Sequence, residues 1–200
     1  MIPAEHHDET LALAVTSVVV RLRTGSPWSP AEASLPEPLR SPGATFVTLR
    51  RDGALLGCIG TLVPRDPLGV DVARNAAAAA FDDPRLPAVV EADLQAMHVH
   101  VSVLGPLEPL VVHGWDELLA AVRPGVDGLL VEAAWLRATL LPSVWSDRAE
   151  PVGFVSALWL KAGLRPGEWP AGLRLHRYVA GEVSGPAARH LDRAGRLDLA

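Results

Sequence analysis

Apolar residues near the start of the chain recur at helical spacing. We expect a helix over residues 8–23 because its hydrophobic side chains lie three or four positions apart, at Leu11, Val15, Val18 and Leu22. Gly25 follows this pattern, and a glycine just past the last turn commonly ends a helix. The pattern therefore predicts a helix that buries one face in a core.

The next segment, residues 26–43, contains five prolines. Proline lacks an amide donor and restricts the backbone, so this segment is predicted to be an extended loop without regular structure that packs over the domain. Trp28 lies among these prolines. Such a tryptophan either anchors a core or forms the lid of a pocket or a partner surface.

Strand patterns begin after the loop. Residues 44–50 and 54–62 are predicted to form a hairpin, since the Asp52-Gly53 pair between them strongly favours a tight turn. A helix is expected from Pro67 to about Phe81. Over residues 97–104 the apolar side chains alternate with His98, His100 and Ser102, which indicates a half-buried strand.

The second half of the chain continues this mixture of short strands and helices. We expect helices at residues 115–122 and 151–163, and strands at 128–133, 137–141 and 173–183. This order lacks a regular strand–helix alternation. It favours an α+β fold with a largely antiparallel sheet flanked by helices.

Composition narrows the class of protein. The 200 residues are 49 % hydrophobic and 20 % charged, which suits one domain with a small second lobe. The formal net charge of −5 argues against nucleic-acid binding, because that function usually requires a basic face. The single cysteine excludes an intrachain disulfide and a four-cysteine zinc site.

The charges that flank the first apolar run, and the use of arginine in place of lysine, indicate the cellular location and the source of the protein. The apolar run at residues 11–20 follows acidic residues and precedes Arg21 and Arg23, the reverse of a secretory signal, and it is too short to span a bilayer. We therefore expect a cytoplasmic protein without a membrane partner. Lys161 is the only lysine, and this arginine bias is typical of a GC-rich bacterium.

Cys58 lies between Gly57 and Gly60 in an otherwise good strand. Glycine weakens a strand, so the pair indicates a bulge or a close approach of another backbone. If Cys58 lies near the N-terminus of the helix that follows Pro67, the partial positive charge there favours a thiolate. The two interpretations are a buried structural cysteine and a reactive thiol.

Other candidate groups also have two interpretations. Arg85 follows a turn-forming Asp83-Pro84 pair, where its guanidinium either clamps an anionic ligand or ties the turn to a neighbouring acid or carbonyl group. Arg137 and Thr139 share one strand face, which either lines a cleft or faces water. His98 and His100 have metal-ligand spacing but lack a third ligand nearby, so we predict no metal and no cofactor.

Several segments together resemble the AMMECR family. Gly57-Cys58-Ile59-Gly60 matches its hallmark, and further motifs follow in the family's order across residues 12–183: Asp83-Pro84-Arg85-Leu86-Pro87, Val101-Ser102-Val103-Leu104, residues 124–129, residues 137–145, Lys161-Ala162-Gly163-Leu164 and Arg177-Tyr178. The chain departs from the family pattern at three positions. Leu56, Leu86 and Ser143 stand where the family usually has Arg, Phe and Gln.

The resemblance implies a fold and a context. It implies a two-lobed domain over residues 1–185, with a cleft between the lobes that the hallmark segment lines, followed by a tail at residues 186–200. It also implies association with Memo-type and radical-SAM proteins, as in the bacterial AmmeMemoRadiSam system, without supplying a reaction.

Two functions follow as hypotheses. The first is an accessory or binding protein that works with Memo-type and radical-SAM proteins. Its cleft would hold a small-molecule ligand or a partner segment at Gly57, Gly60, Arg85, Arg137 and Thr139. The second is an enzyme that uses Cys58 as a nucleophile on a small anionic substrate.

Overall fold

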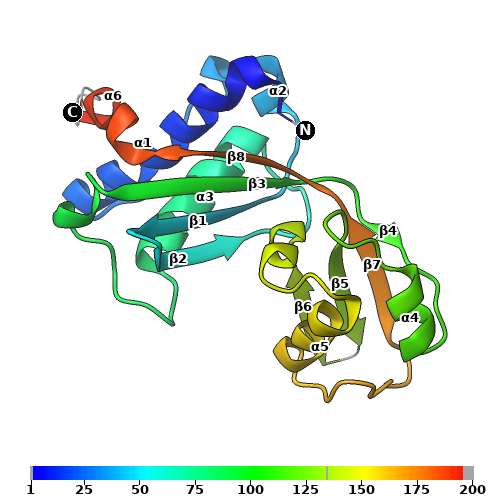
Figure 1. The fold of residues 1–200 in the computed structure, drawn as a ribbon. Helices are drawn as coiled ribbons and strands as arrows, with labels where there is room; N and C mark the ends of the chain where they lie inside the picture. Colours follow the sequence, from blue (N-terminus) through cyan, green and yellow to red (C-terminus); the bar gives the residue numbers. More distant parts are fainter. Residues whose placement is uncertain (1, 134, 196–200) are drawn as a thin grey trace. The chain divides into compact units, whose positions relative to one another are not determined.

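The computed structural model describes residues 2–133 and 135–195. The segment in which apolar and polar residues alternate, 97–104, is an inner strand of a four-stranded sheet. Strand β3 (Met97–Leu104) lies between β1 (Thr45–Arg51) and β8 (Ala180–Pro186). The two edge strands are β8 and β2 (Ala54–Gly60) (Figure 1). β1 and β2 form the predicted hairpin. Its turn is tight because Asp52 and Gly53 both adopt positive φ, at 50° and 82°.

Two long helices pack on one face of this sheet. They are α1 (His7–Thr24), which ends at Gly25 with φ 74°, and α3 (Leu68–Phe81). The shared core consists of fully buried apolar side chains from both helices and both inner strands: Val15, Val18, Val72, Ala76, Val47, Leu49, Val99 and Val101. The apolar spacing of the sequence therefore matches the buried face of each element.

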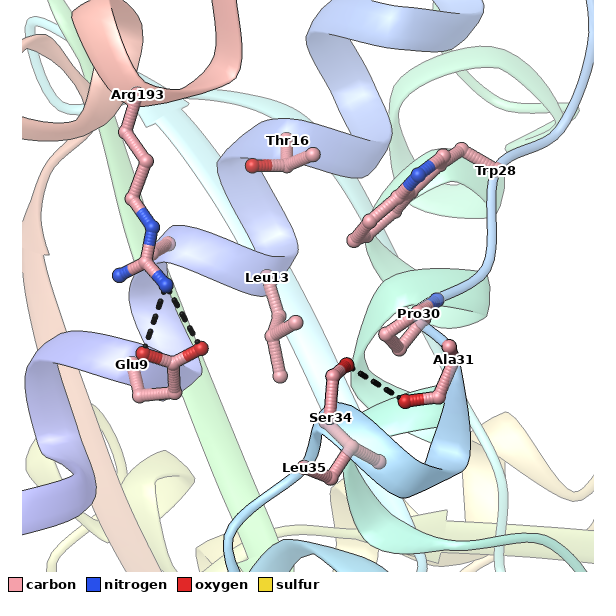
Figure 2. Close-up of a pocket in the computed structure, with 10 residues that line it drawn as sticks. Glu9, Leu13, Thr16, Trp28, Pro30, Ala31, Ser34, Leu35 and Arg193 are labelled. Carbon is pink, nitrogen blue, oxygen red and sulfur yellow. Dashed lines mark hydrogen bonds and ion pairs between the residues drawn. The ribbon is translucent and has the colours of Figure 1, made fainter. Parts of the chain in front are cut away.

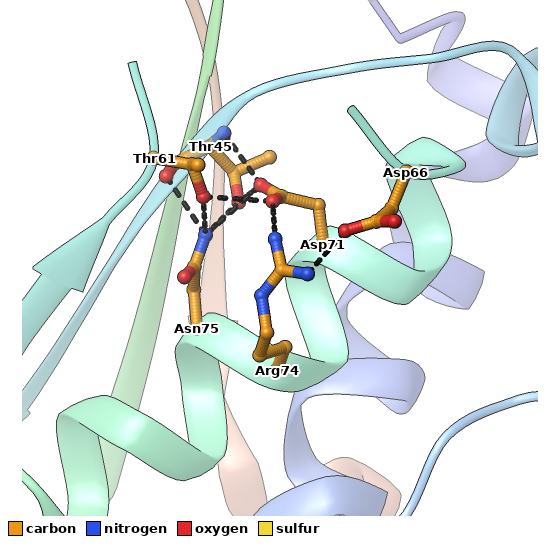
Figure 3. A network of polar contacts seen from close by, with 6 residues as sticks. All are labelled: Thr45, Thr61, Asp66, Asp71, Arg74 and Asn75. Carbon is orange, nitrogen blue, oxygen red and sulfur yellow. Dashed lines mark hydrogen bonds and ion pairs between the residues drawn. The ribbon is translucent and has the colours of Figure 1, made fainter. Parts of the chain in front are cut away.

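A buried polar network joins the start of α3 to the strands (Figure 3). The Asp71 carboxylate accepts hydrogen bonds from the backbone and hydroxyl of Thr45, at 2.8 and 2.7 Å, and from the Thr61 hydroxyl at 2.7 Å. Asn75 Nδ2 and Arg74 donate to the same carboxylate. Because every oxygen of this buried carboxylate is satisfied, the network holds the helix on the sheet in one arrangement.

The second sheet has the order β4-β7-β5-β6. Its strands are β4 (Glu108–Pro109), β5 (Gly128–Ala133), β6 (Leu136–Leu140) and β7 (Arg174–Tyr178). Helices α4 (Trp115–Ala121) and α5 (Pro151–Lys161) share a core with one face of this sheet, where Trp145 stacks on Phe154 with ring centroids 4.0 Å apart.

The chain divides into two compact units. One consists of the described residues of Met1–Leu104 and Gly181–Ala200, and the other of those in Gly105–Ala180. The α+β class predicted from the sequence is confirmed. No helix within the described ranges is long and apolar enough to cross a membrane.

Two predictions were wrong in part. The single strand predicted over residues 173–183 is two strands, because pairing stops at Val179, whose carbonyl accepts a hydrogen bond from Gly105 N at 2.8 Å. β7 and β8 then belong to different sheets. The proline-rich loop contains a 3-10 turn (Glu32–Ser34) and the one-turn helix α2 (Glu37–Arg40), since proline in the first helical turn costs no hydrogen bond.

Residues 187–195, within the predicted tail, are helical. A 3-10 turn (Ala187–His190) leads into α6 (Leu191–Gly195), which contacts α1. Ala187 is fully buried, and Arg193 Nη2 donates to both carboxylate oxygens of Glu9 at 3.0 and 2.9 Å. The rest of the predicted tail, positions 196–200, lies outside the described residues.

Candidate functional site

Both glycines of the Cys58 segment have a packing role. A Cβ at Gly57 would lie 1.8 Å from the carbonyl oxygen of Ala79, so α3 and β2 approach at backbone distance there. A Cβ at Gly60 would lie 2.2 Å from the ring of Phe46. The register also shifts beside Gly57, which confirms the predicted bulge and close approach.

The Cys58 side chain lies on the sheet face that α1 and α3 do not cover. It is half-buried and directly opposite Thr48, whose hydroxyl donates to Cys58 Sγ at 3.2 Å. Thr48 is in turn opposite His100, and His100 Nε2 lies 3.5 Å from Glu182 Oε1. Four polar side chains thus form a row across all four strands.

The backbone of Cys58 is held from the outer side of β2. Its N–H donates to Asp83 Oδ2 at 3.0 Å, and its carbonyl accepts from Arg85 Nη2 at 3.1 Å. Arg85 also donates to Asp83 through Nε at 2.8 Å and Nη2 at 2.7 Å. Since β2 is an edge strand, Asp83 and Arg85 take the place of a neighbouring strand at Cys58. We refer to these two side chains as the edge clasp.

The edge clasp is buried on one side and open on the other. The Asp83 side chain is 2 % exposed, whereas that of Arg85 is 60 % exposed. The Arg85 guanidinium holds the pKa of the Asp83 carboxyl well below its usual range, with help from the backbone N–H groups of Cys58 and Arg85, while burial opposes this shift. The two charges offset each other, so Arg85 offers directed N–H donors more than net positive charge.

The helix-terminus argument for a reactive thiol was wrong. Gly57 contacts Ala79, in the last turn of α3, and Cys58 N–H bonds Asp83, two residues past the end of that helix. The helix N-terminus lies at the other end of a 14-residue helix, about 20 Å away at 1.5 Å per residue. Its partial positive charge therefore does not act on Cys58.

The row also lacks the contacts of a cysteine–histidine pair. Cys58 Sγ bonds Thr48, and no described histidine or carboxylate forms a hydrogen bond with it. His100 is two strands from Cys58, a backbone separation of about 10 Å. His100 Nε2 is buried and has no hydrogen-bond partner among the described residues. Within those residues, no three His, Cys, Asp or Glu side chains are grouped to hold a metal ion.

Arg137 and Thr139 belong to the second unit, on β6, and share one face as expected. Arg137 Nε bonds Glu132 at 3.0 Å, and the Thr139 hydroxyl bonds Leu129 O at 2.8 Å and Tyr178 Oη at 2.6 Å. Burial raises the pKa of Tyr178 to about 12, while its bond to Thr139 acts in the opposite direction. The Thr139 hydroxyl is therefore engaged in hydrogen bonds within the second unit, and the Arg137 side chain is half exposed.

Four contributors were not identified as site residues from the sequence: Thr48, Asp83, His100 and Glu182. Thr48 carried no signal, because a threonine in a strand is ordinary. Asp83 lies in one of the family motifs, where the sequence indicates only a turn. His100 was considered only as a metal ligand, and the strand register was needed to place it in the row with Glu182.

The comparison with known proteins covers the part of the chain that contains the motifs described above. The sequence model of the AMMECR1 family matches residues 11–183. The chain belongs to the AMMECR1 family. This AMMECR1-family chain is 44 % identical over 110 residues to a protein of Methanothermobacter thermautotrophicus, an alignment that covers 55 % of this chain and 57 % of that protein. It is 37 % identical over 157 residues to a protein of Thermofilum pendens, covering 72 % and 74 %.

A solved relative confirms that the AMMECR1-family fold extends over both units. The crystal structure of an uncharacterized protein from Pyrococcus horikoshii matches with a TM-score of 0.86 at 30 % sequence identity. The match covers 94 % of this chain and 95 % of that one. These relatives are mostly archaeal, so the bacterial source and the AmmeMemoRadiSam subtype stay predictions.

Proposed function

We propose that this AMMECR1-family chain is an accessory protein that binds Memo-type and radical-SAM proteins. Its contact surface would be the helix-free face of the first sheet, with Cys58, Thr48, His100 and Glu182 in a row. The observation that carries the proposal is this row, which places a thiol, a hydroxyl, an imidazole and a carboxylate side by side without joining them into a catalytic relay.

The edge clasp supports a binding role. Four hydrogen bonds to Asp83 fix its position, and Arg85 is held by this carboxylate and by the Cys58 carbonyl. Such preorganisation lowers the entropy that a binding surface loses on association. Arg85 keeps an exposed guanidinium edge beside the row, where it can donate to a carboxylate or carbonyl group of a partner.

The inter-lobe cleft, the cytoplasmic location and the ligand contacts of Gly57, Gly60, Arg137 and Thr139 remain predictions. The two glycines support the site indirectly, because their packing sets the position of β2.

The binding proposal is tested with purified proteins and two matched charge reversals. Glu182→Lys places a cation beside His100 in the row, whereas Glu37→Lys reverses an exposed charge on α2. We expect Glu182→Lys to weaken binding to a Memo-type or radical-SAM protein of the source organism about tenfold, and Glu37→Lys to leave it unchanged. Calorimetry that detects no binding to either partner, or equal effects of the two variants, would refute the proposal.

The reactivity of the Cys58 thiol distinguishes the binding protein from the alternative, a cysteine-dependent enzyme. Because Cys58 is the sole cysteine, iodoacetamide labelling of the folded chain reports on this atom alone. Because no described histidine or carboxylate forms a hydrogen bond with Cys58 Sγ, we expect labelling at pH 6 to be slow. Rapid labelling that is already complete at pH 6 would favour the enzyme instead.

A further inference from the structure

A second candidate site lies in the first unit, away from Cys58. An open cavity of about 140 Å³ lies between α1, the proline-rich segment and α6 (Figure 2). Its apolar walls are Leu13, Trp28, Pro30 and Leu35. The Trp28 side chain forms one wall, consistent with the expectation that this tryptophan covers a pocket.

One polar side chain that lines this cavity has no partner within the described part of the protein. Thr16 is 4 % exposed and lines the cavity, yet its hydroxyl has no hydrogen-bond partner among the described residues. Thr10 and Thr24 on the same helix instead bond the carbonyl four residues earlier, both at 2.8 Å. Figure 2 shows the Thr16 oxygen on the side facing Arg193 and its methyl group facing Trp28. The hydroxyl therefore opens into the cavity with its donor and both acceptor sites unused by any described residue, where it can bond a bound molecule.

The lining of the cavity includes an ion pair, Glu9 and Arg193, whose opposite charges neutralise each other. Arg193 Nη2 bonds both carboxylate oxygens of Glu9, at 3.0 and 2.9 Å. A ligand with a net charge would have to displace one partner of this pair. The lining therefore favours a neutral molecule.

We propose that this cavity binds a neutral molecule the size of one six-membered ring that carries a hydroxyl group. The ring would contact Leu13, Trp28 and Leu35, and the hydroxyl would bond Thr16 Oγ1. The volume sets the size, because a cavity of about 150 Å³ accepts a molecule such as benzene. Trp28 supplies an aromatic surface for the ring, and Thr16 supplies specificity.

The test compares phenol with toluene, which has a methyl group in place of the hydroxyl. Binding is followed by ¹H–¹⁵N NMR titration, with the Trp28 indole signal assigned through Trp28→Phe. We expect phenol to shift this signal in a saturable way and to bind about threefold to tenfold more tightly than toluene. Thr16→Val, which keeps the side-chain shape, should remove that preference.

Two further variants complete the test. Thr10→Val removes a buried hydroxyl outside the cavity and should leave the phenol preference unchanged. Leu13→Trp fills the cavity and should abolish binding of both probes. The inference is overturned if phenol leaves the Trp28 signal unshifted, if Thr16→Val keeps the preference, or if Leu13→Trp still binds. None of these outcomes depends on Cys58 or on the accessory role.

Discussion

Asp82 and Asp83 are consecutive residues that each bind an arginine, yet we expect very different consequences when they are replaced by asparagine. Asp82 pairs with Arg21 through two hydrogen bonds of 2.6 Å, and its side chain is 51 % exposed. Asp83 pairs with Arg85 at 2.7 and 2.8 Å, and its side chain is 2 % exposed. Asp83→Asn should therefore destabilise the fold strongly and Asp82→Asn only slightly.

The magnitudes follow from what each change leaves unpaired. An exposed ion pair contributes about 0.2–1 kcal/mol, which sets the cost of Asp82→Asn. In Asp83→Asn, one amide oxygen must replace two carboxylate oxygens that accept four hydrogen bonds, including that of Cys58 N–H. Each buried donor left unsatisfied costs about 1–3 kcal/mol. Because Arg85 is exposed enough to be rehydrated, we expect a total near the lower end, about 3 kcal/mol.

Urea unfolding followed by circular dichroism measures both free energies at pH 7. Amide hydrogen exchange of β2 localises the effect, since Cys58 N–H should exchange faster in Asp83→Asn only. The depressed pKa of Asp83 adds a pH test: its stabilisation is present above its unfolded pKa of about 4 and is lost as the pH falls through the lower folded pKa. The reasoning is refuted if Asp82→Asn costs as much as Asp83→Asn.

Three further predictions concern other parts of the fold. Gly57→Ala should destabilise the protein by about 1–3 kcal/mol in urea unfolding, because its Cβ would overlap the Ala79 carbonyl; a cost near zero would mean that α3 moves freely. Tyr178 is the sole tyrosine, so absorbance at 295 nm should show ionisation only near pH 12; its raised pKa stabilises the fold below pH 10, and this stabilisation is lost between pH 10 and 12. Titration near pH 10 in the folded chain would contradict this. Asn75→Ala should cost about 2–3 kcal/mol by calorimetry, because Thr45 O and the Asp71 carboxylate lose a buried donor; an unchanged melting temperature would show that water replaces the amide.

Local patterns were sufficient for most elements. Helical spacing before Gly25, the Asp52-Gly53 turn and the alternation over residues 97–104 each depend on backbone geometry and on neighbours within a few residues. The glycines beside Cys58 similarly indicated a bulge and a close backbone contact before any partner was known. The sequence contains these signals because one face of each helix or strand must be apolar, or because a close contact leaves no room for a side chain larger than that of glycine.

Pairing between distant segments required the folded chain. The sequence predicts one continuous strand through Val179, and only the hydrogen-bond partners assign the residues on its two sides to different sheets. The edge clasp joins Asp83 and Arg85 to a strand more than 20 positions earlier, and the row from Cys58 to Glu182 exists only through strand register. Composition and spacing could thus predict which residues are buried and which elements they form. The partners of each polar group were decided by long-range contacts, because hydrogen bonding depends on position in space and not on separation along the chain.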